Sequence, residues 1–242
     1  MRGLITAFRT LTILPLPGKD AEKFSSALFF FPLVGGLVGL LTALTGWGVG
    51  HGLGWPLGAG VAAVALSTVV TGGLHLDGLA DGFDSLGGRT RERKLEIMKD
   101  PRVGSYGVMA LVIVLLAKFV SFYRLSEAGH YAFMVLPFIA SRTLQVAPVV
   151  WLPYARAEGG TGKPFVDGAG PLHFLVALAL AAGLCFWAGG AVGLLALAAA
   201  CVPAALVMAW MKRAFGGMTG DLLGLTSEIV ETCVLVGLAA AG

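Results

Sequence analysis

Two long segments of the 242-residue chain contain no Asp, Glu, Lys or Arg: residues 24–76 and residues 168–211. A helix needs about 20 predominantly apolar residues to cross the hydrocarbon core of a bilayer, so each segment can supply two crossings. In the whole chain 57% of residues are hydrophobic and only 13% are charged, whereas soluble domains carry roughly 25% charged residues. The sequence therefore predicts an integral membrane protein made of helices.

Glycine, proline and polar residues divide the apolar sequence into spans. We expect a break near residues 50–56 in the first charge-free segment and another near 187–190 in the second, with further spans at about 106–123, 131–151 and 222–240. The predicted fold is all-α, a polytopic membrane helix bundle of six to seven transmembrane helices that forms one domain over residues 1–242. Residues 1–23 are predicted to be an interfacial segment containing an amphipathic helix; a disordered start is the alternative.

The Lys and Arg residues indicate the orientation of the bundle. Fourteen of the seventeen lie in alternate loops, and such loops face the cytoplasm in bacterial membrane proteins. The prediction is a multi-pass protein of the bacterial cytoplasmic (inner) membrane, with its N-terminus and its acidic loops on the cytoplasmic side. The positive charge is spread over short loops, which does not indicate nucleic-acid binding. These fourteen residues are Arg2, Arg9, Lys19, Lys23, Arg89, Arg91, Arg93, Lys94, Lys99, Arg102, Arg156, Lys163, Lys212 and Arg213.

An acidic cluster follows the first charge-free segment, in the stretch GGLHLDGLADGFDSLGG at residues 72–88. If this stretch is helical, Asp77, Asp81 and Asp84 fall within about 60° of arc and share one face. Three uncompensated carboxylates near a membrane are costly, and Mg²⁺ accepts such hard oxygen ligands together with substrate phosphates. The cluster therefore indicates a Mg²⁺ site in which all three aspartates are ligands and catalytic residues.

Two features of this stretch bear on that interpretation. Its glycines at 78, 82, 87 and 88 suggest a distorted helix that a ligand approaches closely. The alternative is structural: Asp77 caps a helix, and the three acids pair with Arg89, Arg91 and Arg93 on a solvated face.

The stretch from 75 to 104 is predicted to be the cytoplasmic active-site segment. Lys99 and Arg102 have the charge to bind phosphate, although anchoring at the inner membrane face explains them equally well. Asp100 is followed by Pro101, so it is either a helix N-cap or a ligand. The candidate substrate-binding residues of this segment are His75, Glu96, Lys99, Asp100 and Arg102.

Three more candidate substrate-binding residues are ionisable groups in later spans. Asp221 and Glu228 are seven residues apart and share one helix face, and ionisable groups inside spans usually mark function. Arg142 stands alone in the fourth span and needs an acidic partner, either Glu228 or a substrate phosphate. The stretch AEGGTGKPF at 157–165 is similar to a phosphate-binding loop but lacks its first glycine and its Ser/Thr, so we interpret it as a flexible loop.

These stretches together resemble the cobalamin synthase family, the adenosylcobinamide-GDP ribazoletransferases. The resemblance lies in GGLHLDGLADGFD, RKLEIMKDPRVGSYG, YARAEG and GGMTGDLLG, with LTILPLP and FFFPLVGGLVG near the N-terminus. Two departures of this chain from the family pattern affect the expected geometry of the loop. The family commonly has Thr-x-Asp-Gly after the second aspartate, where this chain has Gly82-Phe83-Asp84-Ser85, and it tends to have Ser at the position of Pro101.

The resemblance implies a reaction. The phospho-cobinamide moiety of adenosylcobinamide-GDP passes to α-ribazole or its 5′-phosphate, GMP leaves, and Mg²⁺ is required. Asp77 and Asp81 would hold the ion, Asp84 would be a further ligand or the base, and Asp221, Glu228 and Arg142 would shape the pocket of the second substrate. The partners are these two substrates and the lipid bilayer, and a homo-oligomer is left open.

Two other functions compete with this one. The CDP-alcohol phosphatidyltransferases also place aspartates at the end of a span, but their pattern continues with an Ala-Arg pair that does not follow Asp77-Gly78 here. An ion-coupled transporter would use Asp221, Glu228 and Arg142 as its pathway. Transporters often contain internal repeats, and the two halves of this chain show no convincing one.

Overall fold

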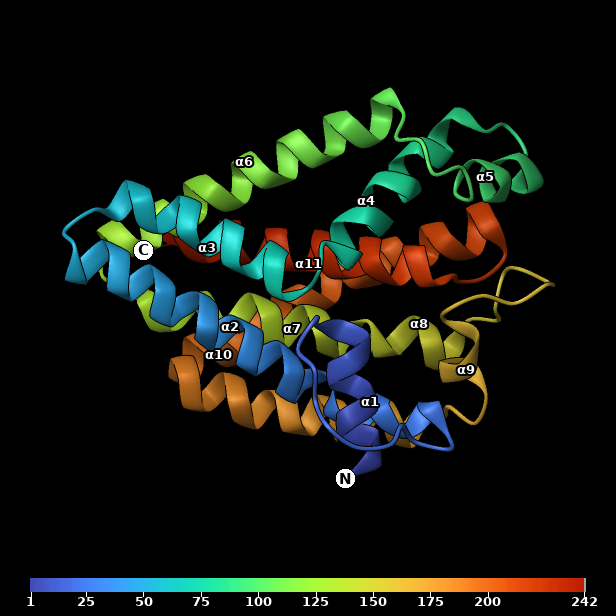
Figure 1. Cartoon of the computed structure of the whole chain (residues 1–242), viewed down its shortest axis with the longest axis horizontal. Helices are drawn as coiled ribbons and strands as arrows, with labels where there is room; N and C mark the ends of the chain where they lie inside the picture. The colour runs from blue at the N-terminus through green and yellow to red at the C-terminus, as the bar shows by residue number, and fades with distance from the viewer. Residues whose placement is uncertain (242) are drawn as a thin grey trace.

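The computed structural model describes residues 1–241, which fold into a bundle of helices with no strand among them (Figure 1). This confirms the predicted all-α membrane bundle. The helices run in the order α1 (Arg2–Leu11), η1 (Phe24–Phe30), α2 (Phe31–Trp47), η2 (Gly48–Gly52), α3 (Pro56–Val70), α4 (Leu74–Asp84), η3 (Ser85–Gly87), α5 (Arg91–Ile97), α6 (Ser105–Glu127), η4 (Tyr131–Val135), α7 (Leu136–Leu144), α8 (Val146–Trp151), α9 (Lys163–Val166), α10 (Pro171–Phe215) and α11 (Gly220–Ala241).

Five helical segments in residues 1–241 are apolar and long enough to cross a membrane: 24–52, 105–127, 131–151, 171–215 and 220–241. The segments 56–70 and 74–87, bent by 89° at the short break between them, add a sixth if the bent pair is counted as one span. The first expected break is confirmed, because the helix of residues 24–52 ends before Leu53 and α3 begins at Pro56.

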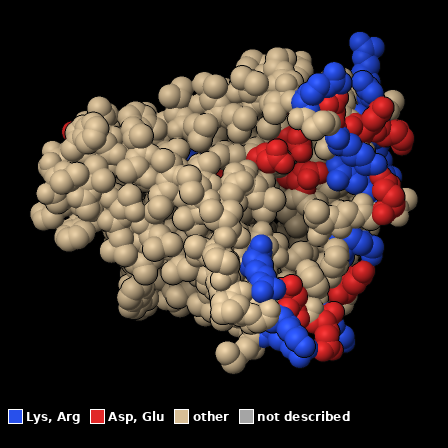
Figure 2. Space-filling view, in the orientation of Figure 1, with Lys and Arg blue, Asp and Glu red and all other residues tan. Residues whose placement is uncertain are grey.

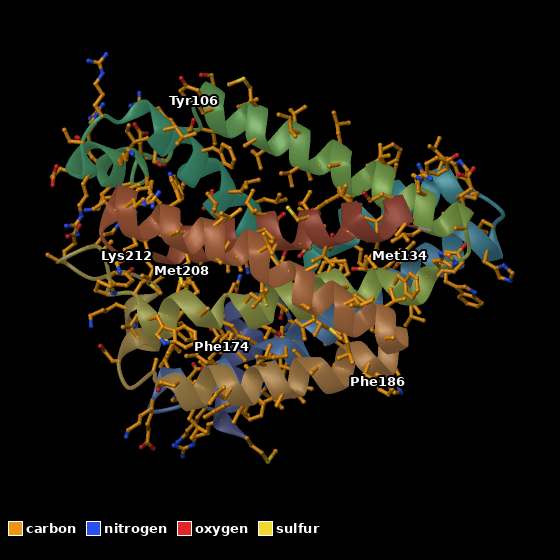
Figure 3. All side chains as sticks on the ribbon, turned by 180° about the vertical axis from the view of Figure 1, so that it is seen from behind. Tyr106, Met134, Phe174, Phe186, Met208 and Lys212 are labelled. Atoms are coloured by element: carbon orange, nitrogen blue, oxygen red, sulfur yellow. The ribbon has the colours of Figure 1, made fainter. Side chains whose placement is uncertain are left out.

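The second expected break lies inside α10. Gly190 has φ 55° and ψ −136°, a conformation that no helix contains and that glycine tolerates. The chain reverses there: the first half of α10 runs from Phe174 to Phe186, and the second half returns past Met208 to Lys212 at the starting end (Figure 3). Gly193 lies against the carbonyl of Cys185, which brings the two halves into contact. The 45-residue helix therefore supplies the two antiparallel spans that the sequence predicts.

The centre of the bundle is α7, in which every residue is buried. Helix α2 packs closely against it because Gly35 meets the carbonyl of Phe138 and Gly39 meets that of Val135. Glycines four residues apart let two backbones approach in a membrane protein. The hydrophobic core surrounds this pair and extends to α10 and α11.

Helix α4 is positioned by the sharp turn that precedes it. Gly72 and Gly73 have φ values of 61° and 69°, which side chains larger than hydrogen rarely adopt. The turn sends α4 out between α6 and α11 (Figure 1), where Leu79, Ala110 and Leu225 form a small second core. This packing carries the acidic stretch to one end of the molecule.

Nearly all visible charged side chains gather at that end, and the opposite end is almost bare of them (Figure 2). The expected N-terminal helix is present as α1, with Thr6, Ala7 and Leu11 buried against the bundle. Its polar contacts are to the segment that follows it: Thr6 Oγ1 accepts from Ala21 N at 2.8 Å, and Arg9 reaches Asp20 at 3.1 Å.

Candidate active site

The site begins with two carboxylates on α4. The stretch is helical, as the shared-face argument requires, and Asp77 and Asp81 lie one turn apart. Neither side chain accepts a hydrogen bond or forms an ion pair within residues 1–241. The arginines suggested as partners bind elsewhere: Arg91 donates to the carbonyl of Ala155 at 3.0 Å and Arg93 to Glu96 at 2.7 Å. The solvated-face alternative is therefore wrong for Arg91 and Arg93, and the N-cap of α4 is Gly73 rather than Asp77.

A third carboxylate joins them from α11. Asp77 and Asp221 line the same cavity, and the backbone carbonyl of Asp221 lies against Gly78, between Asp77 and Asp81 in the sequence. Asp221 begins α11 and accepts a hydrogen bond from Arg156 at 2.8 Å. Helices α4 and α11 thus combine three acids around a single basic group.

The glycines of α4 explain how the two helices come so close. The position of a Cβ on Gly78 coincides with the carbonyl of Asp221, and one on Gly82 would overlap the side chain of Leu225. The expectation that these two glycines distort the helix for a ligand is wrong: they lie within a regular helix and admit α11 instead.

Asp84 differs from the other two aspartates of α4. Its carboxylate accepts hydrogen bonds from the backbone N–H groups of Gly104, at 2.7 Å, and Gly107, at 2.8 Å. Both belong to the N-terminus of α6, where N–H groups lack helical partners and a negative charge is favourable. A Cβ on either glycine would come within 2.5 Å of an Asp84 oxygen. Asp84 therefore holds the start of α6 instead of standing free beside Asp81.

The donor chemistry of the acidic group suits Mg²⁺, which prefers carboxylate oxygens supplemented by water and phosphate. Asp77 and Asp81 are unpartnered carboxylates with Asp221 beside them. Within residues 1–241, no three His, Cys, Asp or Glu side chains are arranged as a complete metal-binding group. The residues thus fit an ion that two protein carboxylates and a substrate bind together, and not a closed site of three aspartates.

A cavity of about 280 Å³ opens beside the acidic group, lined by residues of α1, α4 and α11 together with residues of η1, α2, α8 and α9. Its polar lining residues His75, Asp77 and Asp221 come from α4 and α11, with Gln145 just after α7, and His75 Nδ1 lies 3.4 Å from Arg142 Nη2. We call this part of the lining the polar end. The apolar end is the part that other elements supply, with Leu11, Leu28, Phe31, Val149 and Phe165.

A larger cavity, of about 490 Å³, lies on the other side of Asp84. Its lining is about half polar and includes three of the predicted residues, Glu96, Asp100 and Arg102, together with Arg93. Asp100 is not a helix N-cap as one alternative proposed, because α6 begins only at Ser105. Its carboxylate instead binds Arg102, and hydrogen bonds from the side chain and backbone of Arg102 lower the pKa of Asp100 to about 2.

Lys99 points away from that cavity and forms an ion pair with Glu158 in the loop between α8 and α9. The same loop carries Arg156, and it is fixed to the segment before α11 by the bond from Ala155 N to Met218 O at 2.8 Å. Arg156 is a site residue that the sequence reasoning missed, although the YARAEG stretch contains it. The loop also brings Thr161 to the first cavity, so the AEGGTGKPF stretch is part of the site surroundings.

Glu228 and Arg142 lie in a different group, buried between α6, α7 and α11. Lys118 donates to Glu228 at 2.5 Å and to Glu231 at 2.6 Å, and Arg142 forms an ion pair with Glu231. Arg142 also donates to Ser227 at 2.7 Å. The partner of Arg142 is therefore Glu231, not Glu228 as the sequence suggested. Lys118 was missed, although a lone lysine within a span is itself a signal that an acid lies nearby.

Comparisons with known proteins agree with this architecture. The model of the family described as cobalamin-5-phosphate synthase matches residues 3–239. An adenosylcobinamide-GDP ribazoletransferase of Chlorobaculum parvum is 45% identical over 240 residues, which cover 97% of this chain and 93% of the relative. Enzymes of the same name from Chlorobium phaeobacteroides (44%; 98% and 96% covered) and Syntrophobacter fumaroxidans (42%; 97% and 91% covered) are similar.

No solved structure matches the chain. The family match nevertheless spans all the helices that build the acidic group, both cavities and the buried ionic group. It favours the resemblance drawn from the motifs over a phosphatidyltransferase or a transporter. By sequence and by the arrangement of its motifs, the chain belongs to the cobalamin-5-phosphate synthase family.

Proposed function

We propose that this protein transfers the phospho-cobinamide moiety of adenosylcobinamide-GDP to α-ribazole or its 5′-phosphate and releases GMP. The observation that carries the proposal is the acidic group of Asp77, Asp81 and Asp221, of which only Asp221 has a basic partner among the residues that the structure describes. Three carboxylates around one guanidinium leave net negative charge at a site whose substrate is itself a diphosphate. Such a site needs a divalent cation to bind that substrate.

Asp77 and Asp81 would hold Mg²⁺, with the remaining ligands supplied by the diphosphate and water. When bound, the ion would offset negative charge on the diphosphate and on the leaving GMP. Asp84, whose carboxylate is already bound to two backbone N–H groups, would act by positioning α6 rather than as a ligand or base.

The transfer forms one bond and breaks one. A ribose hydroxyl oxygen bonds to the phosphorus that carries the corrinoid arm, the bond from that phosphorus to GMP breaks, and the hydroxyl proton passes to a nearby base. Such reactions depend mainly on alignment and charge stabilisation. Arg156 lies beside the acids, and Arg93 and Arg102 line the larger cavity. We assign these guanidinium groups to the phosphates, with Lys99 holding the loop that carries Arg156.

The chain is a multi-pass membrane protein, and we place it in the bacterial cytoplasmic membrane with the charged end inside. The support is the concentration of Lys and Arg at that end (Figure 2), which in membrane proteins faces the cytoplasm. The site would then open to the compartment that contains nucleotides.

The decisive experiment supplies purified protein in detergent with adenosylcobinamide-GDP and α-ribazole, with Mg²⁺ or with EDTA, and measures GMP and the completed corrinoid. We expect equal amounts of both products with Mg²⁺ and neither with EDTA. GMP without a new corrinoid would indicate hydrolysis, and an undiminished rate in EDTA would exclude the metal. Transport of substrate into sealed vesicles without chemistry would contradict the proposal altogether.

A further inference from the structure

The cavity between α1, α4 and α11 takes its charged and amide groups from different elements than its aromatic rings. Its polar end contains Asp77 and Asp221, both members of the acidic group. Its apolar end contains two aromatic rings, those of Phe31 and Phe165, whose centroids lie 6.0 Å apart. A ligand that fills the cavity must therefore be polar where it meets the carboxylates and flat or apolar at the other end.

The volume of this cavity indicates which of the two substrates fits it. Pockets for drug-sized ligands measure roughly 300–1,000 Å³, and this cavity is about 280 Å³. A nucleoside is near the lower end of that range, whereas a corrinoid joined to a nucleoside diphosphate is far above it. We place the nucleotide part of the larger substrate in the cavity beyond Asp84, whose lining includes Arg93 and Arg102.

The polar groups along the cavity also fit a nucleoside. Buried Gln145 donates its amide N–H to the carbonyl of Leu223 at 3.3 Å, and no residue within 1–241 donates to its amide oxygen. Thr10 lies in the lining from α1, and its hydroxyl donates to the carbonyl of Thr6 at 2.7 Å. Hydroxyl groups of a ribose could therefore bind along one wall while an apolar base lies among the phenylalanines.

We propose that this cavity binds the nucleoside co-substrate, with its ribose beside Asp77 and its base in the apolar end between Leu11 and Phe165. The inference rests on the proposed function. It gives α1 a role beyond lying at the membrane surface, because α1 supplies the wall that limits the size of the base. It also replaces Glu228 and Arg142, which belong to the buried ionic group, as the residues that shape the second substrate's pocket.

The test changes the size of the apolar end and compares two nucleosides, α-ribazole and its analogue without the two methyl groups of the benzimidazole. Leu11→Phe reduces the space, so the ratio of kcat/KM for the smaller base to that for α-ribazole should rise about tenfold or more. Phe165→Leu enlarges the space and should lower the same ratio. The KM for adenosylcobinamide-GDP should stay within about twofold of wild type in both variants.

Leu4→Phe is the matched control, since it makes the same substitution on α1 at a position outside the cavity lining. It should leave the ratio unchanged. The proposal is overturned if wild type forms the corrinoid but neither cavity variant moves the ratio, or if the control moves it equally. A wild-type protein that forms no corrinoid from either nucleoside would instead refute the proposed function, and the cavity assignment with it. Because the two cavity variants act in opposite directions, one that folds poorly leaves the other as a test.

Discussion

Two groups of ionisable side chains in this protein follow opposite rules. The buried group contains two bases and two acids, Lys118, Arg142, Glu228 and Glu231, and every one of them has an oppositely charged partner. The acidic group at the charged end contains Asp77, Asp81 and Asp221, and within residues 1–241 its single ion pair is that of Asp221 with Arg156. Each group includes residues of α11, the first in the middle of that helix and the second at its start.

This difference in charge pairing separates a group that stabilises the fold from a group suited to chemistry. Charges taken out of water are tolerated only when they are paired and hydrogen-bonded, and the buried group meets that condition without any outside partner. The acidic group does not meet that condition by itself. A bound cation together with a phosphorylated substrate would complete its charge balance. We therefore expect a lack of charge balance, rather than the presence of charge inside a span, to mark the active site. The following predictions test this distinction.

The largest effect is expected from breaking the balance of the buried group. Lys118→Met leaves Glu228 without a cation and Glu231 with only Arg142, and removal of one partner from a buried ionic group costs about 3–5 kcal/mol. The free energy of unfolding in detergent should fall by that amount. The double variant Lys118→Met, Glu228→Gln keeps one base and one acid, and it should recover at least half of the loss. A single variant as stable as wild type would show that the group is not the balanced unit described here.

The acidic group should respond in the opposite way. Asp77→Asn or Asp81→Asn removes one of several mutually repelling charges, so the protein should be at least as stable as wild type. The rate of GMP release should nevertheless fall by about 10³-fold, which corresponds to about 4 kcal/mol of transition-state stabilisation. Asp167→Asn is the control, an exposed aspartate paired with Lys163, and should retain the full rate. A fully active Asp81→Asn protein would remove the basis for the metal site.

The sequence predicted those features of the two groups that depend on the local residue pattern. The charge-free segments gave the spans, and the spacing of Asp77 and Asp81 gave their common helix face. The sequence could not predict that Asp221 joins them, because this follows from the contact of Gly78 with the backbone of α11, more than a hundred residues away. Helix periodicity alone likewise cannot separate Asp84 from its neighbours on α4.

A smaller effect is expected at Asp84, the aspartate whose role the structure changes. Asp84→Asn cannot accept hydrogen bonds from both Gly104 and Gly107, and one unsatisfied buried N–H group costs about 1–3 kcal/mol. The free energy of unfolding should fall by that amount. The Mg²⁺ concentration that gives half the maximal rate should stay at the wild-type value, whereas Asp81→Asn should raise it. An equal shift in both variants would return Asp84 to the metal ligands.

The smallest effect is expected at Glu96, which the sequence placed among the substrate-binding residues. Glu96 forms an exposed pair with Arg93 on α5, and such pairs contribute no more than about 1 kcal/mol. Glu96→Gln should therefore change the free energy of unfolding by less than that. Because the substitution frees the guanidinium of Arg93 at the wall of the larger cavity, the KM for adenosylcobinamide-GDP should fall slightly, by about twofold, and this gain should disappear in high salt. A KM raised tenfold or more would mean that Glu96 itself binds the substrate, and the balance of charge in that cavity would then belong to the active site as well.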